Sequence, residues 1–143
     1  SLKQMLYESF EGYGHYFAND RLDKKACTEI YVDWGIRSCL EISVADKVFV
    51  AECDGQTAGM LSFKKMRNEE GAFAAGGIGA VSAKFRGRDV FKQLAVAGMQ
   101  WGGSENLEWE EHNVLTNNYA VNSSFSSLGF KVKNAFLTLH CWL

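Results

Sequence analysis

The dipeptide Asp54-Gly55 is the feature that most constrains how this chain can fold. It joins two runs rich in β-branched and aromatic residues within residues 48–65, VFVAECDGQTAGMLSFKK. An Asp-Gly pair supplies the positive φ angles that a tight two-residue hairpin requires. The sequence therefore predicts an antiparallel β-hairpin here, against which the other elements must pack.

Three further segments are predicted to form strands. A turn at RNEEG, residues 67–71, leads to AFAAGGIGAVSA, residues 72–83, where small residues would let a backbone or a ligand come close. Another strand is expected at residues 109–116. The tail FKVKNAFLTLHCWL, residues 130–143, alternates with period two and predicts a final pair of strands, in which His140 would be a packed residue.

Apolar residues that recur on one helical face predict three helices, at Lys24–Leu40, from Val90 to a stop at Gly102-Gly103, and at Asn118–Leu128. Asp23 is the expected N-cap of the first helix, and Gly129 is the expected C-cap of the last. Residues 10–22 mix aromatic residues with glycines and are interpreted as a loop between two helices.

This order of elements indicates the class of fold. Strands and helices are interspersed, which favours an α/β (α+β mixed) fold with a central mixed β-sheet and helices on both faces. A chain of 143 residues is long enough for one compact domain over residues 1–143 and too short for two of ordinary size.

Composition excludes several classes of function. With 47% hydrophobic residues and a net charge of −2, the chain resembles a globular domain rather than a nucleic-acid-binding protein. Its apolar runs are far shorter than the roughly 20 residues that span a bilayer, so no membrane segment is expected. The four cysteines are widely spaced, which predicts no metal site and no disulfide framework, but reduced, mostly buried thiols in a cytoplasmic protein: Cys27, Cys39, Cys53 and Cys141.

The segment VSAKFRGRDVFKQL, residues 81–94, carries the clearest functional signal. A strand that leads through a basic turn into a helix presents unpaired backbone N–H groups and the positive end of the helix dipole, which together attract phosphate. Arg86 and Arg88 add positive charge to that turn. The spacing matches neither the Walker pattern nor the dinucleotide pattern, and a solvated basic turn is the alternative interpretation.

Residues 81–101, followed by NNYAVNSSFSSLGF at residues 117–130, resemble in content and order the two signature regions of the GNAT N-acetyltransferase superfamily. The residues that match are Val81, Arg86, Gly87 and Arg88 in the first region and Asn118, Leu128, Gly129 and Phe130 in the second. The hairpin is similar to the central hairpin of that family, so the resemblance spans roughly residues 48 to 133. Residues 15–34 together with residues 117–130 look closest to the sugar-amine branch, such as dTDP-fucosamine acetyltransferase.

The resemblance implies transfer of an acetyl group from acetyl-CoA, the cosubstrate, to a primary amine of a small molecule such as a nucleotide-linked amino sugar. It implies a cofactor-binding set made of Val81, Arg86, Gly87, Arg88, Asp89, Val90, Phe91 and Asn118. The expected partner is a small-molecule amine acceptor, with neither nucleic acid nor membrane, and a homodimer is a further expectation.

Three residues depart from the family pattern: Asp89 and Phe91, which replace glycines of the first signature, and Phe125 in the second. Asp89 stands where glycine is expected, so its carboxylate would either weaken CoA binding or cap the helix and occupy the N–H groups itself. Phe125 stands where many members have a tyrosine that serves as general acid. A catalytically silent acyl-CoA-binding or interaction module is therefore the alternative function.

Other polar residues are candidates for the rest of the site. Glu110, Glu111 and His112 precede the second signature and could supply the general base, the alternative being that this run is an exposed strand edge. In the family arrangement the acceptor pocket would be lined by His15, Tyr16 and Arg21, whose aromatic members could equally belong to the core. The usual first strand of the family is not apparent, so either the chain is part of a longer protein or another element or subunit completes the sheet edge.

Overall fold

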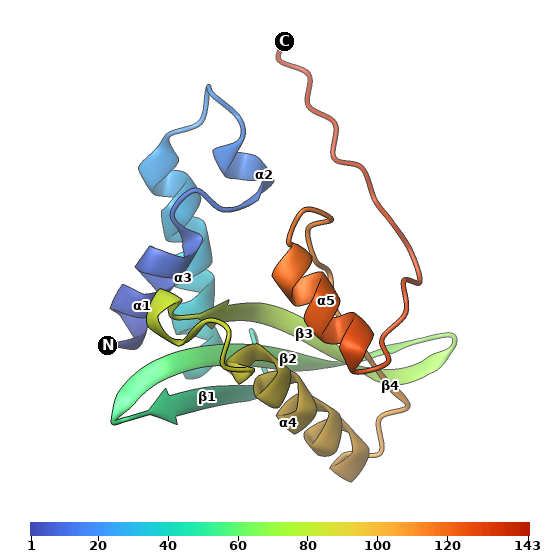
Figure 1. Cartoon of the computed structure of the whole chain (residues 1–143). Coiled ribbons are helices and arrows are strands. Elements are labelled where there is room, and N and C mark those ends of the chain that lie inside the picture. The colour runs from blue at the N-terminus through green and yellow to red at the C-terminus, as the bar shows by residue number, and fades with distance from the viewer.

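The computed structural model describes all residues, 1–143, and contains five α-helices, one 3₁₀ turn and four strands (Figure 1). In chain order these are α1 (Leu2–Phe10), α2 (Gly14–Phe17), α3 (Lys24–Leu40), β1 (Lys47–Cys53), β2 (Gln56–Asn68), β3 (Gly71–Val81), η1 (Ala83–Phe85), α4 (Val90–Ser104), β4 (Trp109–Glu111) and α5 (Tyr119–Ser127). The predicted mixed α/β fold is confirmed.

The hairpin forms where the Asp-Gly pair predicts it. β1 and β2 pair antiparallel from Lys47 opposite Phe63 to Cys53 opposite Gln56. Between them Asp54 has φ 53° and Gly55 has φ 68°, the two left-handed residues that a tight turn needs. The local sequence was therefore sufficient to fix this part of the sheet.

The sheet has the order β1-β2-β3-β4, with β3 antiparallel to β2 and parallel to β4. The parallel pairing covers only three residues and ends with Ala75 opposite Glu111. Beyond Ala75, residues 76–81 of β3 pair with β2 alone, and we call their other side the open β3 edge. The strand predicted at 109–116 is too long, because the chain leaves β3 after Glu111.

A bulge interrupts β3 at the start of the open edge. The two residues Gly77–Ile78 lie opposite the single residue Ser62 of β2. The Ser62 hydroxyl accepts a hydrogen bond from the Ile78 N–H at 2.9 Å and donates one to the Ile78 carbonyl at 3.3 Å. One extra residue reverses the alternation of side chains. Ala74 therefore packs on one face of the sheet and Ile78 on the other.

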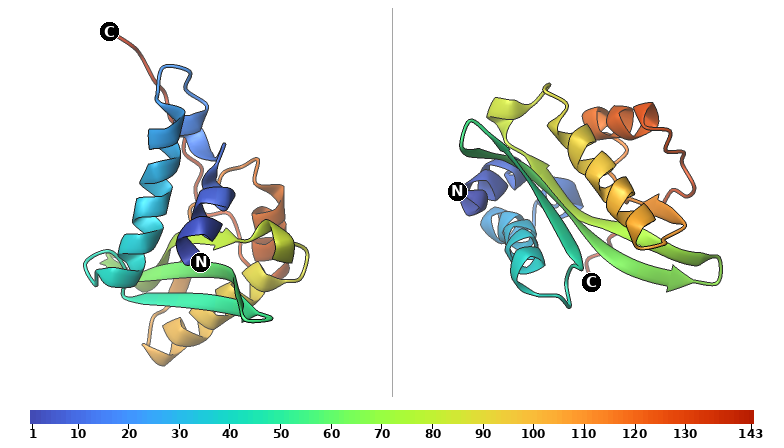
Figure 2. Two further views of the ribbon diagram at one scale, coloured as in Figure 1. Left: turned by 90° about the vertical axis from the view of Figure 1, so that its left-hand side faces the viewer. Right: turned by 90° about the horizontal axis from the view of Figure 1, so that it is seen from below.

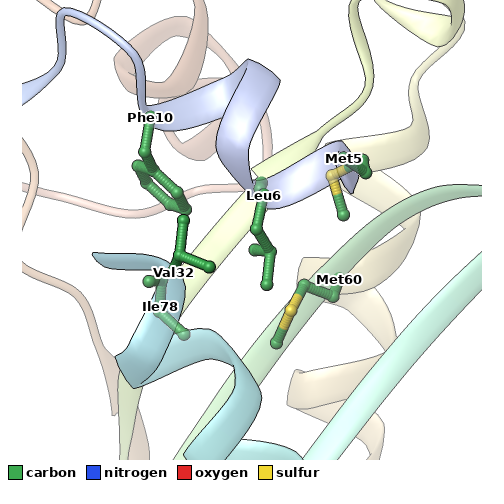
Figure 3. Close-up of a cluster of buried hydrophobic side chains, with 7 residues drawn as sticks. Met5, Leu6, Phe10, Val32, Met60 and Ile78 are labelled. Atoms are coloured by element: carbon green, nitrogen blue, oxygen red, sulfur yellow. The ribbon is translucent and has the colours of Figure 1, made fainter. Parts of the chain in front are cut away.

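Helices cover both faces of the sheet, as predicted (Figure 2). Helices α1 and α3 pack on one face over a cluster of buried side chains (Figure 3): Met5, Leu6, Phe10, Val32, Met60, Ile78 and Ala80. Helices α4 and α5 pack on the other face over a second cluster: Leu61, Phe63, Ala74, Leu94, Ala95 and Phe125. The sheet thus lies between two helical layers, with a separate apolar core on each of its faces.

The predicted helix ends lie within one residue of those in the structure, except for the end of α4. Asp23 caps α3 by accepting a hydrogen bond from the Ala26 N–H at 2.7 Å, and Gly129 follows α5 with φ 90°. Helix α4 continues through both glycines to Ser104 rather than stopping at them. Gly102 is buried there, but an added Cβ would make only ordinary van der Waals contacts with Ala74 and Leu107, so neither packing nor termination requires glycine at this position. Residues 10–22 contain a helical turn, α2, in addition to loop.

The prediction of a final pair of strands is wrong. Residues 130–143 form no strand and run away from the sheet towards the loop beside α2 (Figure 1). His140, expected to be packed, is exposed and forms a hydrogen bond of 3.0 Å with Asn19. Alternation alone cannot make a strand, because the backbone also needs a partner edge and the tail reaches none.

All four cysteines are free thiols, but they are less buried than predicted. Cys27 is buried, whereas Cys39 and Cys141 are exposed. No cluster of three or more His, Cys, Asp or Glu side chains is placed to hold a metal ion. None of the helices combines the length and apolarity needed to cross a bilayer.

Candidate functional site

The loop between β3 and α4 has the backbone geometry of an anion site. After η1 the chain turns at Gly87, φ 75°, and Asp89, φ 57°, two left-handed residues within three positions. A Cβ at Gly87 would touch nothing within 4 Å, so this position favours glycine for its backbone angle and not for space. Aspartate is among the few other residues that tolerate such angles.

The backbone N–H groups of residues 87–92 donate no hydrogen bond within the chain. The first N–H of this region with a partner is that of Gln93, which bonds the Asp89 carbonyl at 3.0 Å. Helix α4 is 15 residues long, so its dipole adds partial positive charge at the same point. A row of free donors at a helix start is an arrangement that binds phosphate.

The Asp89 carboxylate does not occupy these donors. It accepts no capping hydrogen bond and lies 3.6 Å from the Lys92 ammonium, with 71% of the side chain exposed. The interpretation in which Asp89 caps the helix in place of phosphate is therefore wrong. Its negative charge remains beside the loop, partly offset by Lys92.

Buried neighbours fix the position of the loop. Phe85 is 1% exposed and anchors the chain just before the turn, and the Arg88 guanidinium lies 5.6 Å above its ring. Val90 packs against Gly59, where an added Cβ would come 3.1 Å from Val90 Cγ1. The side chains of Arg86 and Arg88 are exposed, so the turn is held by its apolar residues while its charges face solvent.

The remaining predicted cofactor residues have mixed roles. Val81 ends β3 opposite Gly59, at the point where the open β3 edge meets the loop. The Asn118 side-chain oxygen caps α5 by accepting a hydrogen bond from the Val121 N–H at 3.4 Å. Burial raises the pKa of Tyr13, an effect that the neighbouring Asn118 amide opposes. Asn118 thus has a structural role, and the structure shows its amide next to Tyr13.

Glu110 and His112, predicted as candidate bases, form a buried pair. Both side chains are 6% exposed, and His112 Nε2 lies 2.6 Å from Glu110 Oε1. Glu111 lies between them on the strand and instead accepts a hydrogen bond from the Trp109 indole at 3.4 Å. The alternative of an exposed strand edge is therefore wrong for Glu110 and His112.

Aromatic rings surround the His112 imidazole. The centroids of Phe125, Phe63 and Phe130 lie 4.4, 5.7 and 5.9 Å from that of His112. On its remaining side the ring lies against β3, where an added Cβ at Gly76 would collide with His112 Nδ1. The sequence indicated a close approach at this stretch of small residues, but not that a histidine makes it.

The predicted acceptor residues lie apart from this pair. His15, Tyr16 and Arg21 are exposed, so they are not core residues. A groove of about 360 Å³ lies between Tyr16, Asn19 and residues 139–142 of the tail. Arg21 reaches the tail as well, with its guanidinium 5.2 Å from the centre of the Trp142 ring.

No protein-family model and no curated protein sequence matches this chain. Solved structures do resemble it. A Pyrococcus furiosus protein assigned as an acetyl transferase is 16% identical and has a TM-score of 0.77, with 98% of this chain and 91% of the other covered. Aminoglycoside N-acetyltransferase AAC(6')-Iy, in complex with a CoA bisubstrate analogue, is 21% identical with a TM-score of 0.64, covering 78% of this chain and 80% of its own. A transcriptional regulator from Bacillus halodurans is 16% identical with a TM-score of 0.66 and coverage of 98% and 93%.

These neighbours define the class of fold. The structural neighbours include GNAT acetyltransferases, and this chain has the GNAT fold: a mixed sheet between helical layers, with an open strand edge leading to a helix start. At these identities the likeness concerns the fold, and the function has to be argued from the site.

Proposed function

We propose that this protein is an N-acetyltransferase that uses acetyl-CoA and acetylates a primary amine of a small molecule. The observation that carries the proposal is the row of free N–H groups at residues 87–92, next to the open β3 edge. Solved structures of AAC(6')-Iy, which shares this fold, contain CoA or a CoA analogue. For this chain the acetyl donor would be the thioester of acetyl-CoA.

The residues present fit such a ligand in two places. The N–H groups of residues 87–92 would hold the diphosphate, with Arg86 and Arg88 adding charge from the same turn. The open β3 edge offers unpaired backbone groups to the amides of pantetheine, much as a strand edge accepts another strand. Both places need only main-chain donors and acceptors, which Asp89 does not block.

The acceptor we propose is an amine on a sugar, with a nucleotide-linked amino sugar as the first candidate. In support, the groove beside Tyr16 is lined largely by apolar and aromatic side chains, which suit the faces of sugar rings. Aminoglycosides, acetylated by proteins of the same fold, are the comparison substrates.

A catalytically silent acyl-CoA-binding module is the second candidate, and one observation favours it. Phe125 lies between the rings of Phe91, His112 and Phe130, and it has no hydroxyl to protonate a departing thiolate. General acid catalysis commonly contributes about 10²- to 10⁴-fold to a rate. Turnover distinguishes the two candidates, because only the enzyme makes acetylated product.

The binding claim is tested by the backbone amide signals of the ¹⁵N-labelled protein. We expect CoA to shift the signals of residues 87–92 strongly, and pantetheine, which lacks the diphosphate, to leave most of them in place. Arg88→Gln should weaken CoA binding, whereas Arg67→Gln, near the far end of β2, serves as the control of equal charge. Saturating CoA without any shift at residues 87–92 would refute the proposal.

Activity is best measured as acetylated amine by mass spectrometry. Exposed Cys39 and Cys141 would react with thiol reagents and obscure the released CoA thiol. Product with an amino sugar or an aminoglycoside identifies the enzyme, while CoA binding without product from any amine identifies the silent module.

A further inference from the structure

The groove between the α2 loop and the tail is built without acidic side chains. Its walls come from Tyr16, Asn19 and Leu22 on one side and from residues 139–142 on the other. From His112 to Leu143 the chain has no aspartate or glutamate. A surface of this composition offers no charge that could pair with a ligand carrying several positive charges.

The two acidic residues of the neighbouring loop do not line the groove. Asp20 is fully exposed and lies 3.8 Å from the Lys24 ammonium. Asp23 caps α3 by accepting a hydrogen bond from the Ala26 N–H at 2.7 Å. The charge at the groove is therefore set by other side chains.

Arg21 places a positive charge at the rim of the groove. Its guanidinium lies 5.2 Å from the centre of the Trp142 ring, and that ring is part of the wall. No carboxylate pairs with the guanidinium, and only the backbone N–H of Arg21 has a partner, the Asn19 side chain. A guanidinium presents five N–H donors in a planar fork that matches two oxygen atoms of a phosphate.

His140 adds a second donor from the tail. Its Nδ1 lies 3.0 Å from Asn19 Nδ2. An amide nitrogen can only donate, so Nδ1 accepts this hydrogen bond and the neutral ring carries its proton on Nε2. Nε2 has no partner within the chain. Arg21 and His140 thus offer unpaired N–H groups on the two sides of the groove.

A row of aromatic rings connects the groove to the open β3 edge. The ring centres of Tyr16 and Tyr31 lie 6.4 Å apart, and those of Tyr31 and Tyr13 lie 5.4 Å apart. Phe10 stacks on Tyr31 at 5.2 Å and belongs to the same buried cluster as Ile78 of the open edge. Continuous packing therefore joins the groove to the edge that we assign to pantetheine.

We infer that the acceptor carries a phosphate next to its amino sugar, and that Arg21 and His140 bind this phosphate at the rim of the groove. The inference rests on the proposed acetyltransferase function and defines its substrate class. A phosphate supplies the negative charge that the unpaired donors lack. An aminoglycoside would instead place several ammonium groups beside Arg21 without an anionic partner, so the groove selects against it.

The first test measures binding to the protein saturated with CoA, because CoA keeps other phosphates away from residues 87–92. Calorimetric titrations compare glucosamine, glucosamine 1-phosphate, UDP-glucosamine and the aminoglycoside kanamycin. We expect glucosamine 1-phosphate to bind at least about fivefold more tightly than glucosamine, the effect of one pair of unit charges in contact in water. UDP-glucosamine should bind at least as tightly as the sugar phosphate, and kanamycin more weakly than glucosamine.

The ¹⁵N signals of the His140 ring and the Trp142 indole show whether these ligands occupy the groove. Both signals should shift with the two phosphorylated sugars, with or without CoA. They should stay in place with kanamycin.

The second test removes the charge of Arg21. Arg21→Gln should lower the affinity for glucosamine 1-phosphate by about fivefold and leave that for glucosamine unchanged. Arg67→Gln, of equal charge and near the far end of β2, should bind both sugars like wild type. In turnover Arg21→Gln should raise KM for a phosphorylated acceptor and leave kcat unchanged, a split that a merely structural role would not produce.

The outcomes separate the two proposals. Preference for glucosamine or kanamycin over the sugar phosphate, or an equal loss in Arg21→Gln and Arg67→Gln, overturns the phosphate inference while any acetylated product upholds the enzyme. Failure of both phosphorylated sugars to shift the His140 and Trp142 signals also overturns the inference. Phosphate binding in the groove of a protein that acetylates no amine overturns the proposed function instead.

Discussion

Replacing Asp89 by asparagine should tighten the binding of CoA. Asparagine keeps the size of the side chain and tolerates the left-handed angle, φ 57°, that Asp89 adopts. The substitution therefore removes one negative charge from the loop between β3 and α4 without changing its backbone. It also frees the Lys92 ammonium, now 3.6 Å from the carboxylate, to face an anion.

The size of the effect follows from Coulomb's law in water. Two unit charges interact by about 1 kcal/mol at 4 Å, and by about half of that at twice the distance. The carboxylate is 71% exposed, so the value for water applies, and a diphosphate presents more than one charge to it. A gain of about 1–1.4 kcal/mol is expected at low salt, which is about five- to tenfold in Kd. Stability should change by less than about 0.5 kcal/mol, as for most surface substitutions.

Calorimetric titration with CoA at two salt concentrations measures this gain. Screening shortens the range of the interaction from about 10 Å at 0.1 M salt to about 3 Å at 1 M, so most of the advantage should disappear at high salt. Glu69→Gln, in the turn between β2 and β3 at the opposite end of β3, is the control for net charge and should bind like wild type. Unchanged or weaker binding by Asp89→Asn, or an equal gain in Glu69→Gln, would refute the placement of the phosphate at this loop.

Two further predictions concern stability. Gly98→Ala should lower the free energy of unfolding by about 1–3 kcal/mol, because the new Cβ would collide with the fully buried Phe63 ring. Gly103→Ala on the same helix adds a Cβ that meets no other atom, so it should raise the free energy of unfolding by up to about 1 kcal/mol. Thermal melts compare the two variants, and equal melting temperatures would contradict the packing argument. The hydrogen bond from Arg37 lowers the pKa of Glu41, so this contact stabilises the fold above the ordinary carboxyl pKa, and the effect is lost as pH falls through the lowered value. Glu41→Gln should accordingly be less stable than wild type near neutral pH and indistinguishable in acid, as urea titrations at both pH values can show.

Local sequence predicted those parts of the molecule that depend on neighbouring residues. The angles of Asp54 and Gly55, the cap at Asp23 and the free N–H groups after Gly87 all arise within a few residues of chain. Patterns of this kind need no distant partner, and they were enough to predict the hairpin, helices α3, α4 and α5, and the turn that leads from β3 into α4.

Features that need a distant partner could not be derived in this way. The pair of Glu110 and His112 is local in sequence, but its burial depends on Phe63, Phe125 and Gly76, which come from three different elements. The tail has the alternation of a strand and yet remains unpaired, because no sheet edge meets it. The sequence by itself determined where the backbone can turn and begin a helix. Only the tertiary structure decided which side chains lose contact with water, since burial is set by the packing of separate elements against one another.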